Sequence, residues 1–103
     1  MAYVLSNAAR HALADLCMRY GVSELMMFGS GVRGDFQPFT SDIDLLVTFR
    51  PEERVGWFRF SELQESLESV FGREVHLVPK NGLRPIFRES VLAEAVPLYH
   101  DTR

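Results

Sequence analysis

The sequence has little cysteine and no long hydrophobic run. Cys17 is the one cysteine among 103 residues, which excludes an intrachain disulfide and is compatible with a reducing compartment. No stretch approaches the about 20 apolar residues that a membrane-spanning helix needs. Residues 1–10 lack the basic and then apolar pattern of a secretion signal. We therefore expect a cytoplasmic protein that does not enter a membrane.

An excess of positive charge is also lacking. The chain has 11 Lys and Arg against 14 Asp and Glu, which gives a formal net charge of −3. Nucleic-acid binding relies on many Lys and Arg that displace counterions, so a DNA or RNA partner is not expected. A small phosphorylated ligand stays compatible with this charge, because a bound metal ion can supply positive charge locally.

The composition does provide enough apolar residues for a core. Hydrophobic residues make up 47% of the chain and charged residues 24%, which is ordinary for a soluble globular protein. We find no internal repeat and no low-complexity tract. A chain of 103 residues is then expected to form a single domain over 1–103.

Apolar spacing predicts helices and strands in alternation. Helices are expected at 6–20, from 52–56 to 71 and at 85–94, with a short helical turn at 32–36. Strands are expected at 22–28, 41–49, 74–78 and 96–99. This order predicts an α/β or α+β domain in which helices pack on a small mixed β-sheet. It does not predict the order of the strands.

Two aspartates alternate with apolar residues on one predicted strand. Asp42 and Asp44 are two positions apart, so both carboxylates should point to the same face. Converging carboxylates repel each other, which raises a pKa or requires a cation, and their oxygens suit Mg²⁺. Such a pair can hold two metal ions that clamp a phosphoryl group. As an alternative, Asp42 caps a turn. Asp44 lies in an apolar run, where an unpaired charge is costly.

A glycine-rich turn follows the strand expected at 22–28. Gly29 and Ser30 permit a tight turn and close approach of the backbone to a ligand. Their N–H groups and the Ser30 hydroxyl can hold phosphate oxygens, although such a dipeptide is also common in ordinary turns. Arg33 can bind a phosphate with its planar guanidinium, or instead hold the loop by hydrogen bonds.

The two motifs together carry a family resemblance. Residues 28–34, Phe-Gly-Ser-Gly-Val-Arg-Gly, and residues 41–47, Ser-Asp-Ile-Asp-Leu-Leu-Val, resemble the signature of the polymerase-beta-like nucleotidyltransferase superfamily. Chain length and the Arg-Gly pair resemble its minimal nucleotidyltransferase (MNT) group, and the likeness extends over residues 25–99. The resemblance implies the fold described above and transfer of a nucleoside monophosphate from a nucleoside triphosphate to a hydroxyl.

The resemblance also implies roles and a partner. Gly29 and Ser30 would contact the triphosphate of ATP, and Asp42 and Asp44 would bind Mg²⁺. MNT proteins often pair with a HEPN-domain toxin, which they neutralise as antitoxins by adenylylating a tyrosine of the toxin. We therefore expect a hetero-oligomer with a HEPN toxin.

The third predicted strand departs from the family pattern. The family carries a third carboxylate where this chain has His76. His76 can accept a proton in its place and suits Mn²⁺ better than Mg²⁺. Glu74 could replace the carboxylate instead, but its displacement by about 6–7 Å along a strand argues against a shared site. As a further alternative, His76 has no role. Because the third carboxylate is missing, the protein is either an enzyme of reduced activity or a binding module that neutralises its partner without chemistry.

Several other residues have simpler expectations. Cys17 should lie in the core, Asp35 in solvent, and His11 and His100 on the surface. The aromatic residues Trp57, Phe58 and Phe60 should form part of the core with a partly exposed edge, or alternatively a docking patch for a partner.

Overall fold

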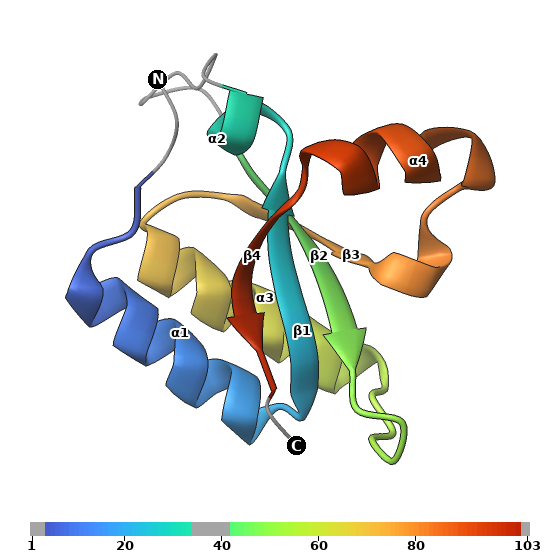
Figure 1. The fold of residues 1–103 in the computed structure, drawn as a ribbon. Helices are drawn as coiled ribbons and strands as arrows, with labels where there is room; N and C mark the ends of the chain where they lie inside the picture. The colour runs from blue at the N-terminus through green and yellow to red at the C-terminus, as the bar shows by residue number, and fades with distance from the viewer. Residues whose placement is uncertain (1–3, 34–41, 102–103) are drawn as a thin grey trace.

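The computed structural model describes residues 4–33 and 42–101. Asp35, and Gly34 and Ser41 of the two motifs, lie outside the described residues. The elements follow one another as α1 (Asn7–Arg19), β1 (Val22–Phe28), α2 (Ser30–Arg33), β2 (Ile43–Phe49), α3 (Trp57–Phe71), β3 (Val75–Pro79), the 3₁₀ turn η1 (Lys80–Gly82), α4 (Pro85–Glu94) and β4 (Val96–His100). This order confirms the predicted alternation (Figure 1).

The strands of the described residues form one mixed sheet. Their order is β3-β2-β1-β4. β1 pairs antiparallel with both β2 and β4, whereas β3 pairs parallel with β2. Parallel neighbours need a crossover connection, and α3 provides it between β2 and β3. The sheet is therefore mixed, as the sequence predicted.

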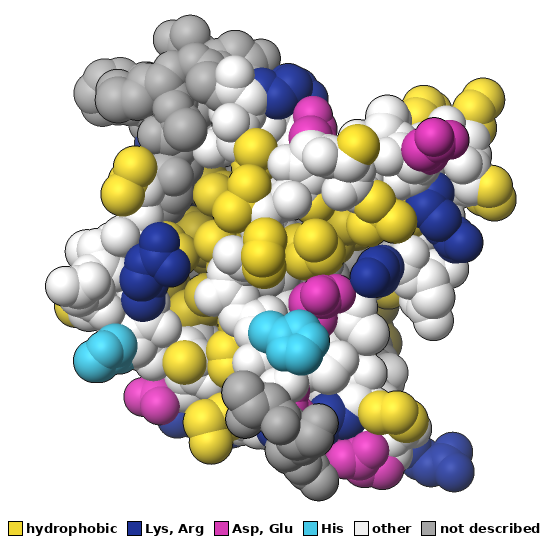
Figure 2. Space-filling model, in the orientation of Figure 1, with side chains coloured by type: hydrophobic (Ala, Val, Ile, Leu, Met, Phe, Trp, Pro, Cys, Tyr) yellow, Lys and Arg dark blue, Asp and Glu magenta, His cyan; other side chains and the backbone are white. Residues whose placement is uncertain are grey.

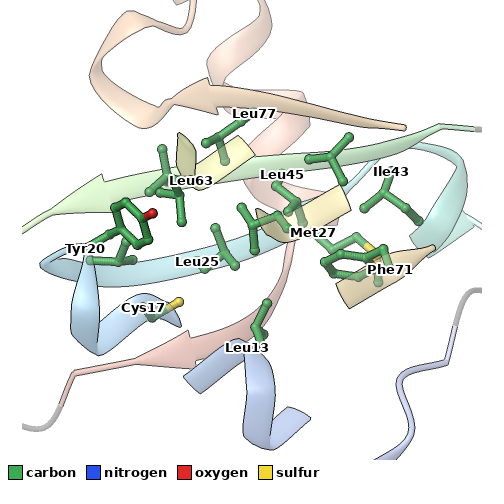
Figure 3. Close-up of a cluster of buried hydrophobic side chains, with 14 of the residues drawn as sticks. Leu13, Cys17, Tyr20, Leu25, Met27, Ile43, Leu45, Leu63, Phe71 and Leu77 are labelled. Atoms are coloured by element: carbon green, nitrogen blue, oxygen red, sulfur yellow. The ribbon is translucent and has the colours of Figure 1, made fainter. Parts of the chain in front are cut away.

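The main core lies between α1, α3 and one face of the sheet. Figure 3 shows side chains from both helices meeting those of the central strands. Cys17 is completely buried there, as expected. Leu13, Leu63, Leu67, Phe71, Leu25, Met27, Ile43, Leu45, Val47, Val75 and Leu77 belong to the same cluster. Phe60 packs against it, but Trp57 and Phe58 are 76% and 81% exposed, so their prediction as core residues was wrong.

Local signals set the ends of two helices as predicted. The Ser6 hydroxyl accepts a hydrogen bond of 3.1 Å from the N–H of Ala9 and caps the start of α1. Gly72 ends α3 with φ of 70°, a left-handed conformation in which glycine is favoured.

Several predicted boundaries were wrong, and the starts of α3, α2 and β2 have a local explanation. α3 begins at Trp57 instead of within 52–56, because Gly56 has an extended backbone and acts as the N-cap. α2 spans Ser30–Arg33 instead of beginning at Val32, because Gly29 already supplies the first carbonyl acceptor to Val32 and Arg33. β2 begins at Ile43, so Asp42 directly precedes the strand.

α4 lies across the sheet from α1 and α3 (Figure 1). Leu46 is 1% exposed without belonging to the main core cluster, which fits its position on the α4 side. In Figure 2 this side carries hydrophobic side chains over the sheet and around α4, and Ile86 and Phe87 of α4 are 81% and 52% exposed. Among the helices of the described residues, none combines the length and the apolar character that crossing a membrane requires.

Candidate active site

Strand register brings Asp44 and His76 together. The parallel pairing of β2 with β3 places Asp44 directly beside His76. Ile43 and Leu45, the neighbours of Asp44, are both fully buried in the core. Because side chains alternate along a strand, Asp44 points to the opposite sheet face, the one that carries α4. Asp44 therefore points away from the main core, and the strand register places His76 beside it.

The His76 ring lies between the two aspartates. Its Nε2 is 3.3 Å from an Asp42 carboxylate oxygen, and its Nδ1 is 3.4 Å from an Asp44 oxygen. A neutral imidazole has one N–H and can donate to one of these carboxylates, whereas the doubly protonated ring can donate to both. With its side chain 54% exposed, His76 is open to solvent and to a ligand.

Glu74 also reaches this site, so the prediction that strand spacing keeps it away was wrong. Its Oε1 lies 3.9 Å from His76 Nε2. Asp42, Glu74 and His76 each offer one atom to a group in which all atoms are within 4.8 Å of one another. The reason is local: β3 begins at Val75, so Glu74 precedes the regular strand and its longer side chain can bend toward Asp42.

The electrostatic environment of Asp44 differs from that of an exposed carboxylate. Burial raises its pKa above the ordinary value, and the nearby charge of Asp42 raises it further. His76 and Arg33 act in the opposite direction on the same pKa. The expected mutual repulsion of the two aspartates is therefore present, but burial is the larger cause. A cation would relieve both effects.

Gly29 lies against the Asp44 carboxylate. The glycine has φ of 76°, which side chains disfavour, and a Cβ at this position would collide with Asp44 Oδ2. Gly29 then leads into α2, whose Val32 and Arg33 N–H groups donate to the Gly29 carbonyl at 3.0 and 3.1 Å. The glycine-rich turn of one motif and Asp44 of the other are thus in direct contact.

Glu94 is a member of this site that the sequence did not reveal. The N–H of Gly29 donates to Glu94 Oε1 at 3.0 Å. The same oxygen lies 3.5 Å from Arg33 Nη1. Glu94 is 65 residues from Gly29 along the chain, and no spacing pattern connects the two. The Arg33 side chain is 53% exposed and takes part in holding the loop, one of its two predicted roles.

The side chains present fit a divalent metal ion. Asp42 and Glu74 offer converging carboxylate oxygens, the ligands that Mg²⁺ and Mn²⁺ prefer, and His76 adds a nitrogen that is better suited to Mn²⁺. Asp44 is outside this converging group but lies against the same imidazole ring. The missing Cβ of Gly29 makes room for the Asp44 carboxylate beside the turn.

Comparison with known proteins gives one consistent family. Residues 10–98 match the model of the nucleotidyltransferase domain family. The protein adenylyltransferase MntA of Thermococcus cleftensis is 43% identical over 82 residues, which cover 80% of this chain and 80% of that protein. A proposed protein adenylyltransferase of Methanocaldococcus jannaschii is 33% identical over 90 residues, 87% of this chain and 94% of the relative.

Solved structures agree on the fold. The structure of a proposed minimal nucleotidyltransferase superimposes with a TM-score of 0.72 at 39% identity, covering 87% of this chain and 89% of the other. A toxin–antitoxin complex solved with AMP-PNP contains a chain that matches with a TM-score of 0.70 at 21% identity, covering 90% of this chain and 74% of that one. The latter likeness concerns the fold alone.

Proposed function

Because this chain belongs to the nucleotidyltransferase family, we propose that it transfers AMP from ATP to a hydroxyl of a HEPN-domain toxin, and so acts as its antitoxin. The 43% identity to a protein adenylyltransferase supports a protein acceptor and an adenylyl group as the transferred unit. A tyrosine is the acceptor that the MNT resemblance favours.

One observation carries the proposal: Asp42 and Asp44 both lie against His76, and Asp44 also contacts Gly29 of the turn. Phosphoryl-type transfer depends on positioning and on stabilising negative charge, and needs little covalent chemistry from the protein. In the turn, the Gly29 N–H donates to Glu94, and the Val32 and Arg33 N–H groups donate to the Gly29 carbonyl. We therefore assign contact with the triphosphate to the Ser30 hydroxyl and to Arg33, next to the carboxylate of Asp44.

The proposed reaction has a simple balance. An oxygen of the acceptor hydroxyl forms a bond to the α-phosphorus of ATP, and the bond between that phosphorus and the pyrophosphate oxygen breaks. The hydroxyl loses its proton. His76 is the group we assign as its acceptor, because a ring nitrogen of a neutral imidazole can take up a proton near neutral pH. Its exposure leaves room for the incoming hydroxyl.

Asp42 and Asp44 are the residues we assign to metal binding. A bound Mg²⁺ or Mn²⁺ ion would neutralise charge on the phosphates and orient them. Asp44 is suited to this role because it is held rigidly between buried strand neighbours and lies against Gly29. Glu74 is close enough to His76 and Asp42 to join the donor set.

The experiment is label transfer from ATP to the partner. The chain is incubated with α-labelled ATP, Mg²⁺ or Mn²⁺ and its HEPN partner, and label is followed on the partner protein. We expect transfer by the native chain and none by the Asp42→Ala, Asp44→Ala double variant. If that double variant still neutralises the partner fully and neither protein yields label, the chain acts by complex formation and the enzymatic proposal is wrong.

A second variant tests the role of His76. His76→Asp restores a carboxylate at this position while keeping the strand register. If His76 accepts the proton, the variant should transfer more slowly near neutral pH but keep nucleotide binding. A gain in transfer rate would instead mean that the native site is weakened by the missing carboxylate.

A further inference from the structure

The contact between Glu94 and the glycine-rich turn joins two distant parts of the chain. β1 and β4 are antiparallel, and their last pair toward this end is Met27 with Val96. Continuing the same register places Gly29 opposite Glu94. α4 ends at Glu94, however, so its backbone is helical there and β4 begins only at Val96. The Glu94 side chain supplies the acceptor that the strand no longer provides, at 3.0 Å from the Gly29 N–H.

The same carboxylate oxygen reaches the other end of the turn. Glu94 Oε1 lies 3.0 Å from Gly29 N and 3.5 Å from Arg33 Nη1. Only 27% of the Glu94 side chain is exposed. This partial burial makes its charge-assisted hydrogen bond stronger than one in full solvent. Gly29 and Arg33 bound the segment to which the proposed function assigns the triphosphate. One carboxylate therefore contacts the backbone at the start of that segment and the side chain at its end.

Asp44 holds the turn from the other side. It lies against Gly29 where a Cβ would be, and the charge of Arg33 acts on its pKa. The turn is thus enclosed between Asp44, on β2, and Glu94, at the end of α4. Gly29 therefore contacts both carboxylates, Asp44 on one side and Glu94 through its N–H.

From these contacts we infer that Glu94 is a positioning residue, which holds the Gly29–Arg33 turn in the conformation that accepts the nucleotide. The inference rests on the proposed function, since it assigns this turn to nucleotide binding. We assign Glu94 no part in the chemical step. Its carboxylate oxygen accepts from the Gly29 N–H and lies near the Arg33 guanidinium, so both the acceptor and its charge act on the turn. An uncharged acceptor of the same shape should therefore keep part of the effect.

The test compares three variants of the full chain. Glu94→Ala removes the acceptor, and Glu94→Gln keeps an acceptor oxygen but removes the charge. Glu89→Ala, at an exposed position of the same helix, removes a negative charge without touching the turn. Binding of AMP-PNP with Mg²⁺ is measured by calorimetry. Hydrogen exchange of the Gly29 amide is measured by NMR without nucleotide.

We expect Glu94→Ala to bind AMP-PNP about tenfold more weakly, which corresponds to losing one hydrogen bond to a charged acceptor. Its Gly29 amide should exchange faster than in the native chain. Glu94→Gln should recover part of both properties, and Glu89→Ala should change neither. Recovery by glutamine separates positioning from a general loss of folding.

Two results would overturn the inference. Tighter binding in both Glu94 variants would mean that the carboxylate competes with the phosphates for Gly29 and Arg33. Unchanged binding in Glu94→Ala, with native binding intact, would mean that the contact does not position the turn. Failure of the proposed function is distinguishable from both, because it appears in the native chain itself, either as no AMP-PNP binding or as no label transfer to the partner.

Discussion

Replacing Gly29 by alanine tests the contact between the turn and the Asp44 carboxylate. Gly29 has φ of 76°, and a left-handed backbone costs an alanine about 1–2 kcal/mol. The new Cβ would also collide with Asp44 Oδ2, so Asp44 or the turn must move. Displacement of packed groups typically costs about 1–3 kcal/mol more. Urea unfolding followed by circular dichroism measures the sum, and AMP-PNP titration with Mg²⁺ measures the effect on the site.

Gly72→Ala is the matched control. Gly72 has φ of 70°, but a Cβ there meets nothing within 4 Å. Both variants should lose stability through the backbone, whereas only Gly29→Ala should lose more and bind AMP-PNP at least about tenfold more weakly. In an Asp44→Ala background the extra loss of stability should disappear, because the colliding group is gone. Equal stability and equal binding in the two glycine variants would refute the reasoning.

Three further predictions concern the fold. The Cys17 thiol is completely buried, and burial raises its pKa to about 12. A thiol reagent should therefore label Cys17 slowly in the native protein and rapidly in denaturant, and fast labelling of the native protein would contradict this burial. Leu67→Ala should lower the free energy of unfolding by about 2–5 kcal/mol in a urea titration, because the side chain is fully buried. Met18→Ala, at a position that is 61% exposed, serves as its control and should change stability by no more than about 0.5 kcal/mol. Ser6→Ala should cost about 0.5–2 kcal/mol by removing the cap of α1, and an unchanged thermal midpoint would argue against that hydrogen bond.

The sequence predicted elements well where local signals bounded them. β1 at Val22–Phe28 and α4 at Pro85–Glu94 agree with the expected ranges, since Gly21 and Pro85 mark their starts. The start of α3 was wrong because residues 52–56 are polar and carry no clear stop signal, while the extended backbone of Gly56 decides the boundary. Strand order was not predictable, because it depends on pairing between strands distant in sequence.

The candidate site was predictable only in part for the same reason. Spacing along one strand put Asp42 and Asp44 on a common face, and the MNT resemblance indicated His76. Contacts between elements decided the rest. Glu74 reaches the site because it precedes the regular part of β3, and Glu94 reaches it because α4 ends opposite Gly29. Neither contact leaves a spacing pattern in the sequence.

The most direct test of the proposed reaction compares ATP labelled at the α-phosphate with ATP labelled at the γ-phosphate. Each is incubated with the chain, its HEPN partner and Mg²⁺ or Mn²⁺, and the partner is then isolated. AMP transfer predicts label on the partner from α-labelled ATP, and release of the γ-label as pyrophosphate. Label on the partner from γ-labelled ATP, or from neither nucleotide, would contradict the proposed reaction.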